Sequence, residues 1–181
     1  MPHLSLLMER MNTPIGQMLL VTDEHQRVRA LDWQDHEDRL HLLMQRQYRG
    51  DTVILNTHSG TSPAALAMQA YFEGDLQIID TIAIATGGTD FQRTVWKALR
   101  DIIPGTPISY AALAEKIGKP SAVRAVGLAN GANPVGIIVP CHRVIGSDKS
   151  LTGYGGGLER KKWLLNHELP KTTAGQFSLH Y

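Results

Sequence analysis

The segment Ile137-Ile138-Val139-Pro140-Cys141-His142-Arg143-Val144 decides how the fold of this sequence is interpreted. It contains the only cysteine in the chain, and a histidine follows that cysteine directly. The apolar, mostly β-branched residues before the proline predict a buried strand over Val135–Val139, which Pro140 ends. We therefore expect the Cys141 thiol at a corner between a strand and a turn, where rigid backbone fixes its direction.

Cys141 also has neighbours that suit nucleophilic chemistry. A lone cysteine is most often a small buried hydrophobic residue. Here the imidazole of His142 can take the thiol proton, and the thiolate is the nucleophilic form of cysteine. Glu168 follows a predicted helix, Leu158–His167, and could orient His142 as the carboxylate of a catalytic triad does. We expect the Arg160–Lys162 face of that helix to lie in solvent.

The composition narrows the class of protein. A chain of 181 residues can form one full domain or two small ones. One cysteine excludes a disulfide framework and a thiolate-cluster zinc site, and it fits a reducing compartment. The sequence contains no apolar run of membrane-spanning length and no signal-peptide pattern at its start. We expect a cytoplasmic protein with no membrane partner.

The net charge of +1 conceals two halves of opposite sign. Residues 1–89 contain six arginines, no lysine and eleven acidic residues, a net charge of −5. Residues 90–168 contain eleven basic and six acidic residues, a net charge of +5. This asymmetry indicates that the second half faces a polyanion, although solvated basic faces are common.

The first half predicts a mixed α/β domain. Its expected strands are Gln17–Thr22, Gln26–Trp33 and Gln77–Ile84. One helix is expected from Asp35, as N-cap, to Tyr48. A second helix should have Ser62 as its cap, Pro63 at its first position and Gly74 just after its end. The histidines of this half have no metal-site spacing, so we predict no metal; they are His25, His36, His41 and His58.

The second half predicts two short helices joined by a glycine-containing turn, a helix-turn-helix. Ser109 is a natural N-cap for Tyr110–Ile117, and Gly118 ends that helix. Pro120 should open the second helix, which runs through Gly127. A turn is then expected over Asn130–Pro134.

The second of these helices is the reading element of a helix-turn-helix. Its residues are small, with Arg124 as the one long cation. A reader of the major groove would be expected to have Asn, Gln or several Arg side chains. Small residues suit close approach to the minor groove, and a tightly packed core helix is the alternative.

Three motifs together resemble the O6-alkylguanine-DNA alkyltransferases, the methylated-DNA–protein-cysteine methyltransferase family. They are Pro140–Val144, Gly153–Gly157 and Trp163–Glu168, and the resemblance extends from about Thr89 to Glu168. It implies an α/β, ribonuclease-H-like domain over residues 1–88. It also implies a mostly α domain over residues 89–168, with a winged-helix-like helix-turn-helix and the active-site cysteine. Residues 169–181 are expected to form a loose tail.

The resemblance also implies roles for individual residues. The reading helix would lie in the minor groove, with Arg124 in the gap left by a flipped nucleotide; its other DNA contacts would be Ala122, Val123, Ala125 and Gly127. His142, oriented by Glu168, would deprotonate Cys141 through a water. Tyr110 would donate its hydroxyl proton to the departing guanine, and Asn133 would tie the reading helix to the active-site loop. The substrate pocket would include Val144, Tyr154, Gly155, Pro134 and Ser147.

The implied reaction is direct transfer of a methyl or larger alkyl group from O6-alkylguanine in double-stranded DNA to Cys141. O4-alkylthymine is a second candidate substrate. The S-alkylcysteine product is a thioether that water does not hydrolyse, and no cofactor is implied. We therefore expect a stoichiometric, suicide reaction by a monomer, with clustering on DNA left open.

Three alternative functions fit the sequence less well. A non-catalytic, lesion-binding relative would share the helix-turn-helix but replace the cysteine, and Cys141 is present. A cysteine hydrolase generally takes its histidine from a distant segment and would leave the helix-turn-helix unexplained. A transcriptional regulator would need a ligand-binding or dimerisation module, and the acidic first half shows no clear one.

Overall fold

The computed structural model describes residues 3–170, which form two compact units. Unit 1 contains the residues up to Gly88 together with Pro134–Ile138. Unit 2 contains Thr89–Asn133 and the residues from Val139 onward. Of the predicted tail, residues 171–181 lie outside the described part of the chain.

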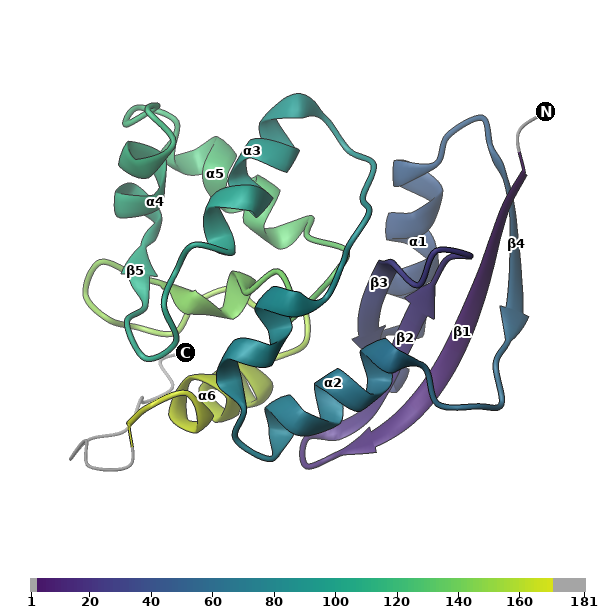
Figure 1. Cartoon of the computed structure of the whole chain (residues 1–181). Coiled ribbons are helices and arrows are strands. Elements are labelled where there is room, and N and C mark those ends of the chain that lie inside the picture. Colours follow the sequence, from purple (N-terminus) through teal and green to yellow (C-terminus); the bar gives the residue numbers. More distant parts are fainter. Residues whose placement is uncertain (1–2, 171–181) are drawn as a thin grey trace. The chain divides into compact units, whose positions relative to one another are not determined.

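Unit 1 is built on a mixed sheet whose described strands have the order β3-β2-β1-β4 (Figure 1). The strands are β1 (His3–Thr13), β2 (Gly16–Thr22), β3 (Val28–Trp33) and β4 (Thr52–Thr57). β2 pairs antiparallel with both β1 and β3, whereas β4 pairs parallel with β1. Two of the three predicted strands are thus confirmed as β2 and β3, and β1 and β4 were not predicted.

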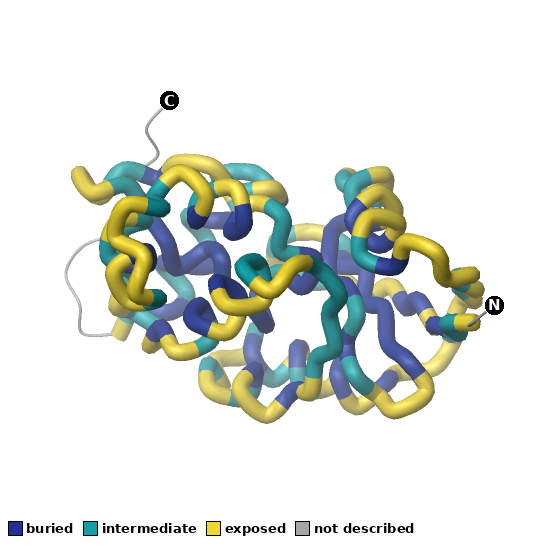
Figure 2. The backbone as a smooth tube through the Cα atoms, turned by 90° about the horizontal axis from the view of Figure 1, so that it is seen from above, coloured by how far each residue is buried: buried dark blue, intermediate teal, exposed yellow. Residues whose placement is uncertain are grey.

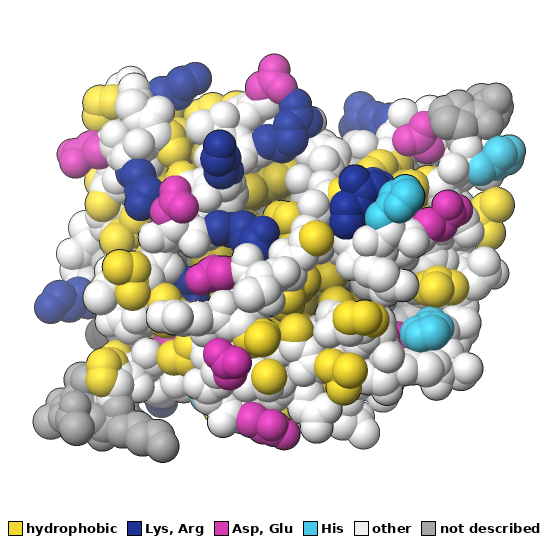
Figure 3. Space-filling view, viewed as in Figure 1, with side chains coloured by type: hydrophobic (Ala, Val, Ile, Leu, Met, Phe, Trp, Pro, Cys, Tyr) yellow, Lys and Arg dark blue, Asp and Glu magenta, His cyan; other side chains and the backbone are white. Residues whose placement is uncertain are grey.

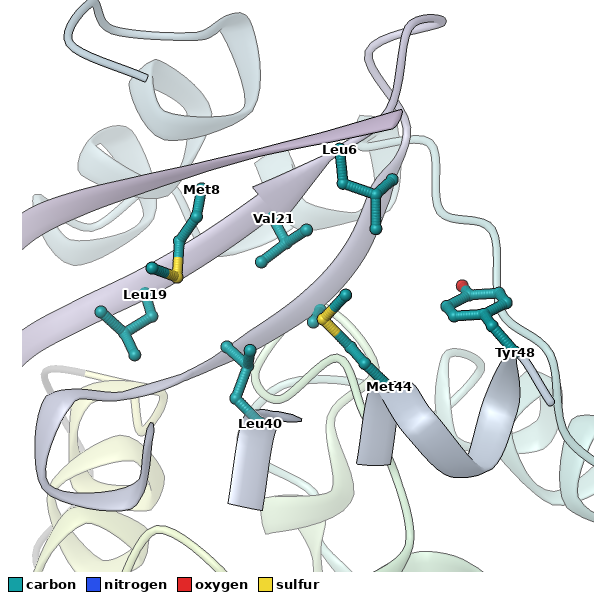
Figure 4. Packing of buried hydrophobic residues seen from close by; sticks show 8 residues of the cluster. Leu6, Met8, Leu19, Val21, Leu40, Met44 and Tyr48 are labelled. Atoms are coloured by element: carbon teal, nitrogen blue, oxygen red, sulfur yellow. The ribbon is translucent and has the colours of Figure 1, made fainter. Parts of the chain in front are cut away.

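Helix α1 (Glu37–Gln47) buries its apolar stripe against this sheet. Figure 4 shows Leu40 and Met44 of α1, with Tyr48 after it, facing side chains of β1 and β2. Burying each such side chain stabilises the fold by about 1.5–3 kcal/mol. The predicted N-cap is wrong, because Asp35 lies in a 3-10 turn, η1 (Gln34–His36), and α1 begins after it.

Helix α2 (Pro63–Phe72) confirms its predicted start, since the Ser62 hydroxyl accepts from the Ala65 N–H at 3.1 Å. The strand predicted over Gln77–Ile84 is wrong. That segment forms a 3-10 helix, η2 (Leu76–Thr81), and only its last residue, Ile84, bridges to Val28 of β3. Alternating apolar residues indicate burial on one side, and a 3-10 helix packed on a core meets that requirement as well.

The strand predicted over Val135–Val139 is also wrong. Val135 alone forms a bridge, to Leu31 of β3, and the following residues turn sharply. Ile138 N–H donates to Gly136 O at 2.7 Å, and Ile137 has a φ of 66°, which β-branched residues rarely adopt. The run is apolar because it is buried, and burial alone does not distinguish a strand from a turn.

Unit 2 is mainly helical. Its described elements are α3 (Asp90–Leu99), β5 (Ile108–Ser109), α4 (Tyr110–Lys116), α5 (Val123–Gly131), η3 (Cys141–Arg143), β6 (Val144–Ile145) and α6 (Leu158–His167). Thr89 and Gln92 form a capping box at α3, and the predicted Ser109 cap of α4 is confirmed. In each unit the buried residues lie along inner segments, and exposed residues follow the outer helix faces and loops (Figure 2).

Helices α4 and α5 form the predicted helix-turn-helix, but the bounds of the second helix differ from the prediction. Pro120 and Ser121 lie in the turn, where Ala122 N–H donates to Lys119 O at 2.9 Å. α5 begins at Val123 and continues to Gly131, through residues predicted as a turn. The mixed α/β and helical parts of the predicted fold are nevertheless confirmed. None of the helices within residues 3–170 has the length and apolar character needed to cross a membrane.

Candidate active site

Cys141 begins the 3-10 turn η3 and is largely buried, with 9% of its surface exposed. Its backbone N–H donates to Val139 O at 2.8 Å, so a tight turn precedes the sulfur. Asn130 near the end of α5 and Asn133 just after that helix hold the same segment. Asn133 Nδ2 donates to Val139 O at 2.8 Å, and Asn130 Nδ2 lies 3.4 Å from Cys141 O.

His142 and Glu168 form a buried pair, with 2.9 Å between His142 Nε2 and Glu168 Oε2. Burial would raise the pKa of Glu168, but hydrogen bonds from His142 and Arg143 hold that pKa below its usual range. Burial lowers the pKa of His142, although Glu168 partly opposes this effect. An ionised Glu168 accepts the proton on Nε2 of a neutral His142, so Nδ1 carries a lone pair. Nδ1 is buried and has no hydrogen-bond partner among the described residues.

Arg143 completes this centre. Its Nε and Nη2 each donate to Glu168 at 2.9 Å, and its Nη1 donates to Ile102 O at 2.6 Å. Arg143 is only 2% exposed, and the two-point contact fixes the carboxylate in one plane. Glu168 is thereby held rigidly against His142, and this role of Arg143 was not predicted from the sequence.

Tyr110 is brought to this region by a short parallel pairing. β5, which ends just before Tyr110, pairs with β6, which directly follows the Cys141 turn. The Tyr110 hydroxyl donates to Thr152 O at 3.3 Å, and burial raises the pKa of Tyr110. A Cβ added at Gly127 would lie 3.9 Å from the Tyr110 ring, and one at Gly153 would lie 3.6 Å from its hydroxyl. Tyr110 is therefore a protonated donor flanked by two glycines.

The exposed face of α5 carries Arg124, Ala125 and Leu128. Leu128 is 73% exposed, lies one helical turn after Arg124, and was not singled out from the sequence. The other predicted DNA-contacting residues, Ala122, Val123 and Gly127, are partly buried. Figure 3 shows Lys and Arg side chains spread over the α3, α4 and α5 side of unit 2, with acidic side chains between them.

The residues predicted for the substrate pocket differ in how far they are exposed. Val144 is buried, Tyr154 is half-buried, and Gly155 and Ser147 are exposed. Pro134 belongs to the segment of unit 1, where its carbonyl accepts from Leu31 N–H at 2.9 Å.

Lys161 corrects another expectation. It was placed on a solvated basic face, but it is fully buried, and its ammonium donates to Val144 O and Thr152 O. No group of three or more His, Cys, Asp or Glu side chains within residues 3–170 could hold a metal ion.

The sequence of this chain matches a known protein family. The family model of the 6-O-methylguanine DNA methyltransferase DNA-binding domain matches residues 90–169. The methylated-DNA–protein-cysteine methyltransferase of Salmonella typhimurium is 50% identical over 167 residues, which cover 91% of this chain and 96% of the relative.

Solved structures agree with the sequence match. The crystal structure of the Mycobacterium tuberculosis O6-methylguanine methyltransferase has a TM-score of 0.70 and 38% identity, covering 94% of this chain and 96% of that chain. The same organism's protein in complex with DNA has a TM-score of 0.69, with 39% identity and coverage of 91% and 96%. The chain belongs to the methylated-DNA–protein-cysteine methyltransferase family.

Proposed function

We propose that this protein repairs O6-alkylguanine in DNA by transferring the alkyl group to Cys141. One observation carries the proposal: the only cysteine of the chain directly precedes a histidine that is buried against an ionised glutamate. This arrangement lies within the residues that match the DNA-binding domain of the family. The chain is a methylated-DNA–protein-cysteine methyltransferase that binds DNA.

DNA contact would come from the exposed face of α5. The small residues of this helix suit the minor groove, and the exposed Leu128 resembles the apolar side chains that minor-groove proteins insert between base steps. The damaged nucleotide must leave the stack to reach the thiol, at a cost of a few kcal/mol. Arg124 would fill the vacated position, and basic residues of unit 2 would contact phosphates without sequence preference.

The chemical step would be a direct displacement. His142 Nδ1 would take the Cys141 proton through a water, with Glu168 stabilising the imidazolium that forms. The thiolate then forms a bond to the alkyl carbon as the bond from that carbon to O6 breaks. Tyr110 would donate a proton to a ring nitrogen of the departing guanine. The imidazolium of His142 then holds the thiol proton and Tyr110 has lost one, so return of a proton from His142 to the Tyr110 oxygen through water would restore both groups and balance the step.

Backbone groups would select guanine in the pocket. The carbonyls of Cys141 and Val144 would accept from the exocyclic amine, which adenine lacks at that position. The Gly155 N–H would donate to O6. Because the product is a stable thioether, each molecule would act once, as a monomer in the cytoplasm on double-stranded DNA.

The test follows the lesion itself. A duplex with one O6-methylguanine is incubated with wild type or Cys141→Ser, digested to nucleosides, and its O6-methylguanine content is measured. Wild type should remove one lesion per protein molecule, and Cys141→Ser should bind the duplex but remove none. Lesion loss with Cys141→Ser would contradict the proposal. Salt-sensitive binding by both proteins without any lesion loss would favour the lesion-binding alternative.

A further inference from the structure

Lys161 is a fully buried lysine in the middle of α6, and the mechanism above does not use it. Its Nζ donates to Val144 O at 2.6 Å and to Thr152 O at 2.8 Å. Within residues 3–170 it forms no salt bridge with a carboxylate, and its hydrogen-bond acceptors are these two carbonyl oxygens. Burying a charge in this way lowers the stability of the fold, so stabilisation alone does not explain why a lysine occupies this position.

The two acceptors of Lys161 belong to segments on either side of the reacting group. Val144 directly follows the Cys141 turn, and Thr152 begins the glycine loop that contains Tyr154 and Gly155. Thr152 O also accepts from the Tyr110 hydroxyl at 3.3 Å. One ammonium group therefore connects the segment after the nucleophile, the glycine loop and, through a shared acceptor, the tyrosine of α4.

We propose that Lys161 is a positioning residue that clamps the Cys141 turn and the glycine loop together, and so fixes the width of the alkylguanine pocket. This inference rests on the proposed alkyl transfer. A carbonyl oxygen has two lone pairs, so a Val144 carbonyl that accepts from Lys161 can also accept from the guanine amine. Lys161 thus acts on guanine through the two backbone segments, without touching the reacting atoms.

The charge of Lys161 suits this role. Burial lowers its pKa to about 8, and the nearby Cys141 partly opposes that shift. The lysine is therefore mostly protonated at neutral pH, and charge-assisted hydrogen bonds to carbonyls are stronger than neutral ones. The charged and titratable groups with which it interacts are Cys141 and His142, and its charge helps to lower the pKa of His142.

The test compares Lys161→Met, which keeps the length of the side chain but removes both hydrogen bonds, with Lys162→Met, a neighbouring partly buried lysine of the same helix. Three quantities are measured: the rate of methyl transfer from duplex DNA, the rate of thiol alkylation by iodoacetamide, and the affinity for DNA. Lys161→Met should lower the transfer rate about tenfold to a hundredfold, because small misplacements of a reacting group have such effects. Its DNA affinity should match that of wild type and Lys162→Met, and its iodoacetamide rate should fall much less than its transfer rate, because loss of the nearby charge affects only the thiolate fraction.

Other results would contradict the proposed positioning role of Lys161. Transfer at the wild-type rate by Lys161→Met would show that pocket width does not depend on this lysine. A parallel loss of all three quantities would show a general effect on folding, and a parallel loss of both thiol reactions alone would show an effect on the sulfur's charge. If Lys161→Met fails to fold, Lys161→Gln, which keeps an N–H donor, decides on the same criteria. A wild type that transfers no methyl group would instead overturn the proposed function, and the clamp with it.

Discussion

Asp23 in unit 1 and Glu168 in unit 2 are both buried carboxylates that accept hydrogen bonds from arginine side chains. Within residues 3–170, the donors to the Asp23 carboxylate all lie within six residues of it: the N–H groups of His25 and Arg27, and the guanidinium groups of Arg27 and Arg29. Asp23 therefore closes the connection between β2 and β3. It stabilises a turn that the local sequence already favours.

The donors to Glu168 come from a distant part of the chain. His142 and Arg143 are 26 and 25 residues away, and one of them is an imidazole that can change its protonation state. Glu168 thus joins the end of α6 to the turn that contains the only cysteine. The origin of the donors, more than burial or pKa, therefore separates a stabilising carboxylate from one that positions a reactive group.

The largest expected effect is that of Glu168→Gln. The change leaves Arg143 buried without an ionised partner, which should lower the free energy of unfolding by about 3–5 kcal/mol. The transfer rate of the folded fraction should fall by about a hundredfold or more, because His142 loses its orienting acceptor. Glu159→Gln, at an exposed position of the same helix, is the control for denaturant melts and transfer assays. Transfer at the wild-type rate by folded Glu168→Gln would show that the Glu168 carboxylate is not needed to position the reactive group.

Asp23→Asn should affect stability alone. Loss of a charged acceptor for two arginines should lower the free energy of unfolding by about 1–3 kcal/mol. Methyl transfer, measured well below the melting temperature, should stay at the wild-type rate. Glu24→Gln, an exposed neighbour, is the control. Slower transfer by folded Asp23→Asn would show that a locally bonded carboxylate also governs the chemistry.

The contribution of Asp23 to the free energy of unfolding should depend on pH in the acid range. Burial would raise the pKa of Asp23, but hydrogen bonds from Arg29, Arg27 and backbone N–H groups lower it from 3.8 to about 2. A carboxylate whose pKa is lower in the folded state contributes stability above its unfolded pKa and loses it as the pH falls toward the folded pKa. The difference in stability between wild type and Asp23→Asn should therefore shrink from pH 4 to pH 2. A constant difference over that range would contradict the assigned pKa shift.

The smallest expected effect is that of Arg27→Ala. The Arg27 side chain is 39% exposed, and Asp23 keeps its contact with Arg29, so the free energy of unfolding should change by less than about 1 kcal/mol. Urea melts at low and high salt measure this change. A larger loss at Arg27 than in Asp23→Asn would show that the arginine acts through packing rather than through the ion pair.

Features set by local chemistry were predictable from the sequence. Three such features are confirmed, and each depends on a few neighbouring residues. They are the Ser62 cap, the Ser109 cap and the helix Leu158–His167. The pairing of β1 with β4 joins segments far apart in the chain, and no local pattern reveals it. The turn before Cys141 was predicted as a strand because both conformations use the same buried apolar residues.

The candidate site was predictable in part. Cys141, His142 and Glu168 follow from residue chemistry and from the family motifs, and the structure places His142 and Glu168 in contact. The burial of Arg143 and Lys161 was not predicted. Charged side chains are usually exposed, and the acceptors that allow their burial here are brought near only by the tertiary structure. The bounds of α5 were missed because a turn at Pro120 and Ser121 delays the start of that helix.

The most direct test of the account is the intact mass of the protein after incubation with a growing excess of duplex DNA containing O6-methylguanine. We expect a gain of one methyl group, which saturates at one per protein molecule and maps to the peptide that contains Cys141. Cys141→Ser should show no gain at any excess of DNA. A methyl group on another residue, or lesion removal that continues without any change in protein mass, would contradict the central claim.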